Sequence, residues 1–215
     1  MPKSTEQNII IPVDGKKLEG ILRLPSNTSL FVVFVHGSGS SRLSPRNAFV
    51  AESLYQAGIG TLLFDLLTET EDETYAARFD IDLLVNRLLS ALAWLRTQEN
   101  TKQLSFGLFG ASTGAAAALI VAAGRPNEIA AVVSRGGRTD LSGDSLSRVV
   151  VPTLFIVGGA DDEVLALNRD SYSQLAGPKD LAVIPGATHL FEEAGALEKV
   201  AELTVKWFVK HTPTH

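Results

Sequence analysis

Three side chains that together could hydrolyse an acyl bond follow one another in the sequence: Ser112 in GASTG, Asp161 in GGADDEV and His189 in GATHLFEE. A serine hydroxyl is a weak nucleophile until a histidine accepts its proton and an acid orients that histidine. The pattern Gly-x-Ser-x-Gly is weak evidence in a chain with 18 glycines, and a serine that caps a helix is the alternative interpretation. The order serine, acid, histidine, each directly after a strand-like run, favours a catalytic triad.

The glycines around Ser112 fit a tight turn between a strand and a helix. A nucleophile on such a turn is held in a strained conformation with its hydroxyl exposed above the sheet. The residues two positions before and after the serine must be small, because strand and helix nearly collide there. Gly110 and Gly114 meet this need, and the alanines at 115–118 would let the helix lie close to the sheet.

The positions of the four histidines favour His189 as the base. His36 precedes the serine and sits beside a glycine turn, where a histidine that braces the loop by hydrogen bonds is the favoured interpretation. His211 and His215 lie at or beyond the end of the last predicted helix, where chain ends are often poorly ordered.

Two neighbouring aspartates compete for the role of the acid. Asp161 lies nearer the end of the preceding strand and is favoured. Asp162 is the alternative, although it can equally cap the helix that begins near Glu163.

Backbone N–H groups in two loops are candidates for binding an oxyanion. Such a site uses the N–H after the nucleophile, here Thr113, and one from the loop after an earlier strand. In that loop, HGSGSS, Ser38 is favoured over Gly37, and a merely flexible glycine turn is the alternative. Thr113 also opens a helix, whose positive end favours negative charge. A phosphate-binding loop is disfavoured, because neither common glycine-rich phosphate motif is intact.

Four arginines follow strand ends near these loops, namely Arg135 and Arg138 after one strand and Arg42 and Arg46 after the HGSG loop. Guanidinium groups bind carboxylates through paired hydrogen bonds, so the set could bind a substrate that carries a second, acidic group. Arg135 and Arg138 are favoured as substrate-binding residues. The alternative is that these arginines face water or pair with nearby acids, which are Asp140, Asp144 and Glu52.

The elements that must position these residues begin with two strand-like runs joined by Asp14-Gly15, a pair typical of type I′ hairpins. Short, almost continuously apolar runs follow, and such runs suit strands buried on both faces of a parallel sheet. They cover residues 30–35, 59–64, 104–109, 129–133, 153–157 and 181–184.

Helical patterns lie between these runs, clearest at residues 81–95 and 197–208, where apolar residues recur every three or four positions. Alternating strands and helices predict an α/β fold with a mainly parallel sheet, which binds ligands at the carboxyl ends of its strands. The acidic stretch 69–73 is most simply a solvated loop. Residues 129–151 leave no room for a helical lid, so we expect an open pocket that prefers short acyl chains.

Composition bounds the function. The net charge is −5 and the basic residues are scattered, so we expect no nucleic-acid partner. The chain has no cysteine, which excludes disulfides, thiolate metal ligands and a cysteine nucleophile. No apolar run reaches the roughly 20 residues of a membrane span. We therefore expect a soluble, cytoplasmic protein with no membrane partner, as a monomer or a homodimer.

Four segments, FVVFVHGSGSS, GLFGASTGAAAAL, VPTLFIVGGADDEVL and IPGATHLFEE, together resemble the dienelactone hydrolase-like group of the α/β-hydrolase superfamily. The resemblance covers essentially the whole chain. It implies one domain over residues 1–215, with an eight-stranded sheet flanked by helices, no metal, no cofactor, and hydrolysis of small esters or lactones. The chain departs from the family at the nucleophile, where true dienelactone hydrolases carry cysteine and this chain has Ser112. We therefore expect a serine esterase, and the sequence does not specify which ester it prefers.

The sequence thus predicts a serine hydrolase that cleaves a small carboxylic ester, lactone or thioester through an acyl-enzyme. Two alternatives remain. One is a non-catalytic binding protein that keeps the α/β-hydrolase pocket, since a fold does not fix a function. The other is transfer of the acyl group to an acceptor other than water.

Overall fold

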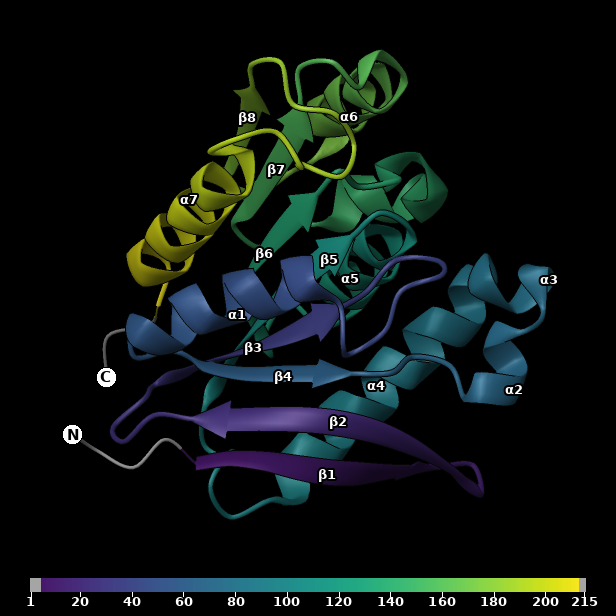
Figure 1. The fold of residues 1–215 in the computed structure, drawn as a ribbon, viewed down its shortest axis with the longest axis vertical. Coiled ribbons are helices and arrows are strands. Elements are labelled where there is room, and N and C mark those ends of the chain that lie inside the picture. Colours follow the sequence, from purple (N-terminus) through teal and green to yellow (C-terminus); the bar gives the residue numbers. More distant parts are fainter. Residues whose placement is uncertain (1–4, 213–215) are drawn as a thin grey trace.

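A single eight-stranded sheet organises the chain in the computed structural model, which describes residues 5–212. The strand order is β1-β2-β4-β3-β5-β6-β7-β8, and every neighbouring pair from β4 to β8 is parallel (Figure 1). This confirms the predicted mainly parallel sheet. The strands are β1 (Thr5–Val13), β2 (Lys16–Leu24), β3 (Leu30–Val35), β4 (Gly60–Phe64), β5 (Ser105–Ala111), β6 (Ile129–Arg135), β7 (Thr153–Gly158) and β8 (Lys179–Ile184).

The N-terminal hairpin is formed by β1 and β2, which pair antiparallel across the turn at Asp14 and Gly15. Both turn residues have positive φ, 47° and 76°, as a type I′ turn requires. The predicted hairpin is therefore confirmed, and β2 joins it to the rest of the sheet by pairing antiparallel with β4.

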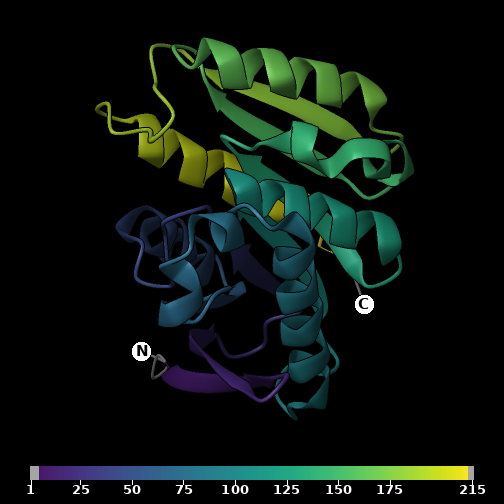
Figure 2. The same cartoon turned by 90° about the vertical axis from the view of Figure 1, so that its right-hand side faces the viewer.

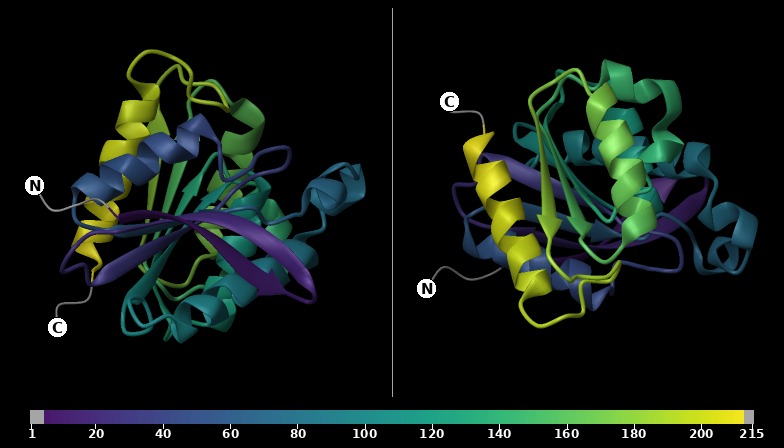
Figure 3. Two further views of the ribbon diagram at one scale, coloured as in Figure 1. Left: turned by 60° about the horizontal axis from the view of Figure 1, so that its bottom comes forward. Right: turned by 90° about the horizontal axis from the view of Figure 1, so that it is seen from above.

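Helices cover both faces of the sheet. On one face α1 packs against α7; on the other lie α4, α5, the 3₁₀ segment η1 and α6 (Figures 1 and 2). Figure 3 shows α6 and α7 on opposite sides of β7 and β8. The helices are α1 (Pro45–Gln56), α2 (Glu69–Asp72), α3 (Tyr75–Arg78), α4 (Ile81–Thr97), α5 (Thr113–Gly124), η1 (Thr139–Arg148), α6 (Asp162–Gln174) and α7 (Ala196–Lys210).

Strand β3 shows why the central strands are apolar throughout. Its alternate residues Phe31 and Val33 enter the core beneath α4 and α5, while Val32 and Phe34 enter the core beneath α1 and α7. Burial on both faces removes any need for alternation with polar residues. The edge strand β8 departs from this rule, because only Ile184 in it is fully buried.

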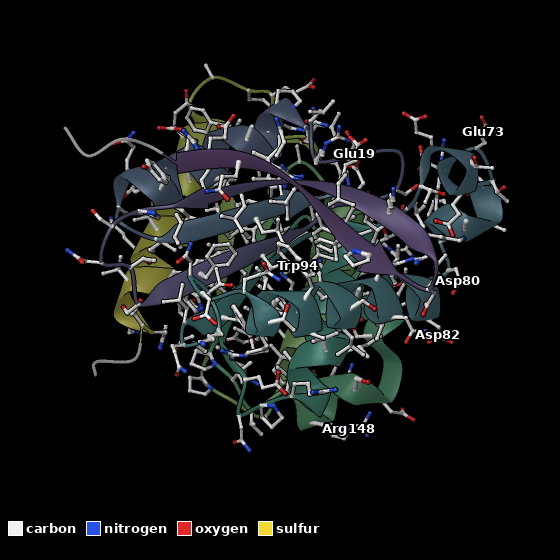
Figure 4. The ribbon with its side chains drawn as sticks, turned by 90° about the horizontal axis from the view of Figure 1, so that it is seen from below. Glu19, Glu73, Asp80, Asp82, Trp94 and Arg148 are labelled. Atoms are coloured by element: carbon white, nitrogen blue, oxygen red, sulfur yellow. The ribbon has the colours of Figure 1, made fainter. Side chains whose placement is uncertain are left out.

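One expectation about the loops needs correction. The acidic stretch 69–73, expected to be a solvated loop, forms a short helix, α2, over Glu69–Asp72, and its Glu71 forms ion pairs with Lys16 and with the buried Arg87. Helices α2 and α3 together form an arm, residues 69–78, that lies beside the start of α4. Figure 4 shows Glu73 of this arm, and Asp80 and Asp82 at the start of α4, at one end of the molecule.

No helix within residues 5–212 has both the length and the apolar character needed to cross a bilayer.

Candidate active site

Ser112 lies in the turn between β5 and α5 with φ 50° and ψ −122°. A positive φ is strained for a residue with a side chain, and such strain persists only where the surroundings enforce it. The surroundings are close-packed here. A Cβ at Gly114 would collide with the carbonyl oxygen of Val35, and one at Gly110 would collide with Ala115. The predicted need for small residues on both sides of the serine is therefore met by direct steric exclusion.

Asp161 and His189 come together from the ends of β7 and β8. The Asp161 Oδ2 and His189 Nδ1 atoms are 2.7 Å apart, with the carboxylate side chain 15% exposed and the imidazole 39% exposed. A proton on Nδ1, donated to this carboxylate, leaves Nε2 as the free acceptor. Asp162 is exposed as the first residue of α6, so the geometry favours Asp161 as the partner of His189.

The end of β6 connects the serine with the histidine. The backbone N–H of Ser112 donates to the carbonyl oxygen of Arg135 at 3.2 Å. A Cβ at the next residue, Gly136, would lie 3.3 Å from Cε1 of His189. The end of β6 therefore bonds to the backbone of the serine and the following glycine lies beside the ring of the histidine, so the carboxyl ends of β5, β6, β7 and β8 converge on one site.

The HGSG loop lies against the same serine. A Cβ at Gly37 would be 2.9 Å from Cβ of Ser112, which explains the glycine. The backbone N–H of Ser38 donates to Oγ1 of the buried Thr113 at 3.0 Å. The two residues expected to bind an oxyanion are thus adjacent, and in this structure the Thr113 hydroxyl is the hydrogen-bond acceptor of the Ser38 N–H.

His36 braces this loop, as the sequence predicted. Its Nε2 accepts the backbone N–H of Leu66 at 3.0 Å, and its Nδ1 donates to the carbonyl oxygen of Gly37 at 2.9 Å. Burial is the main cause that lowers the pKa of His36 below its usual value. The neutral ring therefore ties the loop after β3 to the loop after β4.

The four arginines do not form the convergent set that the sequence allowed. Arg138 makes a bidentate pair with Asp140, at 2.9 and 2.8 Å, which is the alternative foreseen for it. Arg42 pairs with Asp65 and Glu19. Arg46 pairs with the exposed carboxylate of Glu192 at 3.3 Å.

Arg135 is placed differently from its prediction. It is the last residue of β6 rather than part of the following loop, and it is only 8% exposed. Within residues 5–212 its side chain has no hydrogen-bond or ion-pair partner, and the Nε and Nη1 atoms are buried without one.

Several supporting contacts gave no signal in the sequence. The Thr188 hydroxyl donates to Glu193 at 2.6 Å beside His189, and the Asn168 side chain donates to the carbonyl oxygen of Gly137 at 2.8 Å. The first contact lies within the loop between β8 and α7, and the second ties helix α6 to the turn after β6. Of the other two histidines, His211 ends α7 against the ring of Trp207, and His215 lies outside the described residues.

A cavity of about 490 Å³ adjoins the HGSG loop. Its lining includes His36, Ser41 and Arg42 together with Asp65 and Thr68. It therefore lies between the loop and the α2–α3 arm, whose Arg78 approaches to 3.9 Å from a Cβ placed at Gly39. Within residues 5–212, no group of three or more His, Asp or Glu side chains is arranged to hold a metal ion.

Comparison with known proteins places this chain in a family. The dienelactone hydrolase from Anabaena variabilis is 50% identical, with a TM-score of 0.95 over 98% of this chain and all of that one. The esterase Est1E from Butyrivibrio proteoclasticus is 17% identical with a TM-score of 0.81 over 95% of this chain and 98% of that one, which shows a shared fold alone.

A longer relative carries a different name. A protein of Mycobacterium tuberculosis (strain H37Rv), provisionally named a phosphoribosyl transferase, is 51% identical over 210 residues, which is 98% of this chain and 47% of that protein. The chain thus spans about half the length of this curated relative. The sequence model of the Dienelactone hydrolase family matches residues 48–211. The chain therefore belongs to the dienelactone hydrolase family and has the α/β-hydrolase fold.

Proposed function

We propose that this member of the family is a serine hydrolase that cleaves a small carboxylic ester, lactone or thioester through an acyl-enzyme. The observation that carries the proposal is the 2.7 Å pairing of Asp161 with His189 at the site where Ser112 is held in its strained turn. A structural serine has no need of a positive φ, which costs stability. For an activated nucleophile the strained turn has a use, because it holds the serine hydroxyl exposed to the substrate.

In the proposed reaction the Oγ atom of Ser112 attacks the acyl carbon while His189 accepts the serine proton on Nε2. Asp161 stabilises the imidazolium that forms, and His189 returns the proton to the leaving oxygen or sulfur atom. Water, activated by the same histidine, then attacks the acyl-enzyme and releases the acid. The chain thus supplies a nucleophile, a base and an orienting acid from its own side chains.

The backbone N–H groups of Ser38 and Thr113 are the proposed oxyanion donors. The Ser38 N–H already points at Oγ1 of Thr113, so an oxyanion would have to replace this hydroxyl as its acceptor. An anionic oxygen is the stronger acceptor, because hydrogen bonds to charged groups are roughly twice as strong as neutral ones. The exchange therefore favours the tetrahedral intermediate over the resting state.

The name of the mycobacterial relative does not change this proposal. That protein is more than twice as long as the matched segment, because the match covers 47% of it. A transferase activity there can belong to the other half. The site described above contains the groups of acyl chemistry, so we assign acyl hydrolysis to the matched half.

The test is labelling with a fluorophosphonate probe, followed by a screen of p-nitrophenyl esters. We expect stoichiometric labelling of the intact chain and none in Ser112→Ala, with Ser147→Ala, an exposed serine in η1, as the matched control. Loss of turnover in Ser112→Ala should be on the order of 10⁴-fold or more. Equal labelling of all three chains would refute the proposal, and labelling without turnover would favour a binding protein. Added alcohols that divert the acyl group would reveal transfer.

A further inference from the structure

The end of β6 and the turn after it, residues 135–138 and here called the β6 turn, hold both backbone polar groups of Ser112. The carbonyl oxygen of Arg135 accepts the N–H of Ser112 at 3.2 Å, and the N–H of Arg138 donates to the carbonyl oxygen of Ser112 at 3.0 Å. Ser112 has φ 50°, a conformation that persists only where the surrounding structure enforces it. Because the two hydrogen bonds fix the peptide groups on both sides of the serine Cα atom, the β6 turn helps to enforce the strain.

The β6 turn needs glycine at its centre, which makes it depend on contacts from outside. Gly136 has φ 51°, and its N–H donates to the carbonyl oxygen of Ile156 at 2.8 Å. A Cβ at Gly137 would lie only 2.1 Å from Oγ of Ser134, so a larger residue does not fit there. Two successive glycines give the backbone more freedom than other residues would. Other elements must therefore restrain this turn.

Asn168 of α6 supplies such a restraint. Its side chain is fully buried, and Nδ2 donates to the carbonyl oxygen of Gly137 at 2.8 Å and to that of Val164 in its own helix at 2.8 Å. Its Oδ1 atom is buried without a hydrogen-bond partner among residues 5–212. A buried amide with an unpaired oxygen lowers the stability of a fold, so this residue calls for an explanation.

The same helix begins at the acid of the site. Asp161 is the N-cap of α6, and its carbonyl oxygen accepts the N–H of Leu165 at 2.8 Å. Asn168 follows Asp161 by seven residues, which is about two turns of helix. Helix α6 thus contacts the partner of His189 at its start and, two turns later, the turn that holds the nucleophile. One rigid element therefore sets the distance between the acid and the β6 turn.

We propose that Asn168 is a positioning residue for the reaction. By fixing the β6 turn to α6, it holds the strained backbone of Ser112 in the place that Asp161 and His189 require. The proposal rests on the serine hydrolase function and adds to it a residue that touches no reacting atom. Such a residue matters for the rate, because a displacement of about 1 Å at a reacting group can slow a reaction about a hundredfold.

The kinetic test measures inactivation by a fluorophosphonate, which is a single covalent step on Ser112. In Asn168→Leu the rate constant kinact should fall by about tenfold to a hundredfold while KI stays within about twofold. Asn168→Ser should behave alike, because its shorter side chain keeps a donor for Val164 but not for Gly137. If Asn168→Leu does not fold, Asn168→Ser carries the test.

Ser171→Ala provides the matched control. It removes the other buried polar contact between α6 and the segment after β6, in which the Thr139 hydroxyl donates to Oγ of Ser171 at 2.8 Å. A mere loss of stability would affect this variant and the Asn168 variants alike. We expect kinact within about twofold of the wild type, because Thr139 lies outside the β6 turn. An unchanged kinact in both Asn168 variants, or an equal fall in Ser171→Ala, would overturn the proposal.

A stability test separates this proposal from the hydrolase proposal, because it needs no activity. Ser112→Gly removes the strain, since glycine tolerates a positive φ, whereas Ser112→Ala keeps the strain and removes only the hydroxyl. Where the strain is present, Asn168→Leu allows Ser112 to relax, which returns part of the lost stability. Asn168→Leu should therefore lower the urea midpoint more in Ser112→Gly than in the wild type, and by equal amounts in Ser112→Ala and the wild type.

The two proposals can fail separately. Equal drops of the urea midpoint in all three backgrounds would overturn the role of Asn168, whether or not the chain is a hydrolase. Unequal drops, in a chain whose Ser112 takes no fluorophosphonate, would support the restraint that Asn168 places on Ser112 and refute the hydrolase function alone.

Discussion

Replacing Asp161 by asparagine tests the geometry of the site most directly. The change keeps the shape of the side chain but removes the negative charge that lies 2.7 Å from Nδ1 of His189. Two unit charges about 4 Å apart near a protein surface interact by about 4 kcal/mol. Solvent screens part of this energy, because the His189 side chain is 39% exposed, so about 3 kcal/mol remains, or a loss of about a hundredfold in kcat.

A second effect adds to the loss. The asparagine NH₂ group can donate to Nδ1, which favours the tautomer with its proton on Nε2 and removes the base. Together the two effects should lower kcat by about 10³- to 10⁴-fold, with little change in KM, because Asp161 makes no contact with the acyl group in the proposed reaction. Steady-state hydrolysis of p-nitrophenyl acetate measures both constants.

The neighbouring Asp162 provides the matched control. Asp162→Asn makes the same chemical change one residue away on an exposed side chain, and it should leave kcat within about twofold of the wild type. Circular dichroism should show both variants folded. If Asp162→Asn abolished activity while Asp161→Asn retained it, the assignment of the acid would be refuted.

Three further outcomes follow from the packing and the pKa shift. Gly114→Ala should lower the free energy of unfolding by about 3 kcal/mol in urea denaturation, because the added Cβ would collide with Val35. Gly124→Ala, whose added Cβ meets no other atom, should be neutral or stabilising. Equal effects of the two substitutions would contradict the steric argument. Because the pKa of His36 is lowered on folding, the unfolded chain binds its proton at higher pH, so stability should fall as pH drops below about 6.5. His36→Asn should weaken this pH dependence, and an unchanged profile would refute it. Hydrolysis of p-nitrophenyl esters should decline beyond short acyl chains, and a preference for long chains would contradict the open pocket.

Much of the fold could be predicted from the sequence because its signals are local. The run at 30–35 became β3 with the predicted bounds, since a strand buried on both faces is apolar at every position. The turn at Asp14 and Gly15 formed where two residues tolerant of positive φ adjoin. The steric need for Gly110 was likewise foreseeable, because it arises within one strand-turn-helix unit, whereas Gly114 is required by the end of β3, a distant segment of the chain.

The end of β6 shows where local signals fail. The apolar run stops at Val133, so the sequence placed Arg135 in a loop. In the structure the strand continues through Arg135 and the residue is buried. The cause is the pairing of β6 with β5 and β7, which extends the strand through hydrogen bonds from distant segments. The acidic stretch, by contrast, did carry a local signal for α2, because Thr68 and Glu71 form the capping box of a helix start, and Lys16 and Arg87 then pair with Glu71 from other elements.

The sequence by itself determined which residues could do chemistry and that each of them follows a strand. It could do so because strand ends and turns are recognised from short stretches of neighbouring residues. Only the tertiary structure decided which aspartate reaches His189 and which arginine is left without a partner. Asp161 and Asp162 are adjacent in the chain, yet one faces His189 from the end of β7 and the other faces solvent. The partner of a charged side chain is set by the tertiary structure, because it comes from an element far away in the chain. The free energy of a charge that is excluded from water depends on such a partner far more than that of an exposed charge.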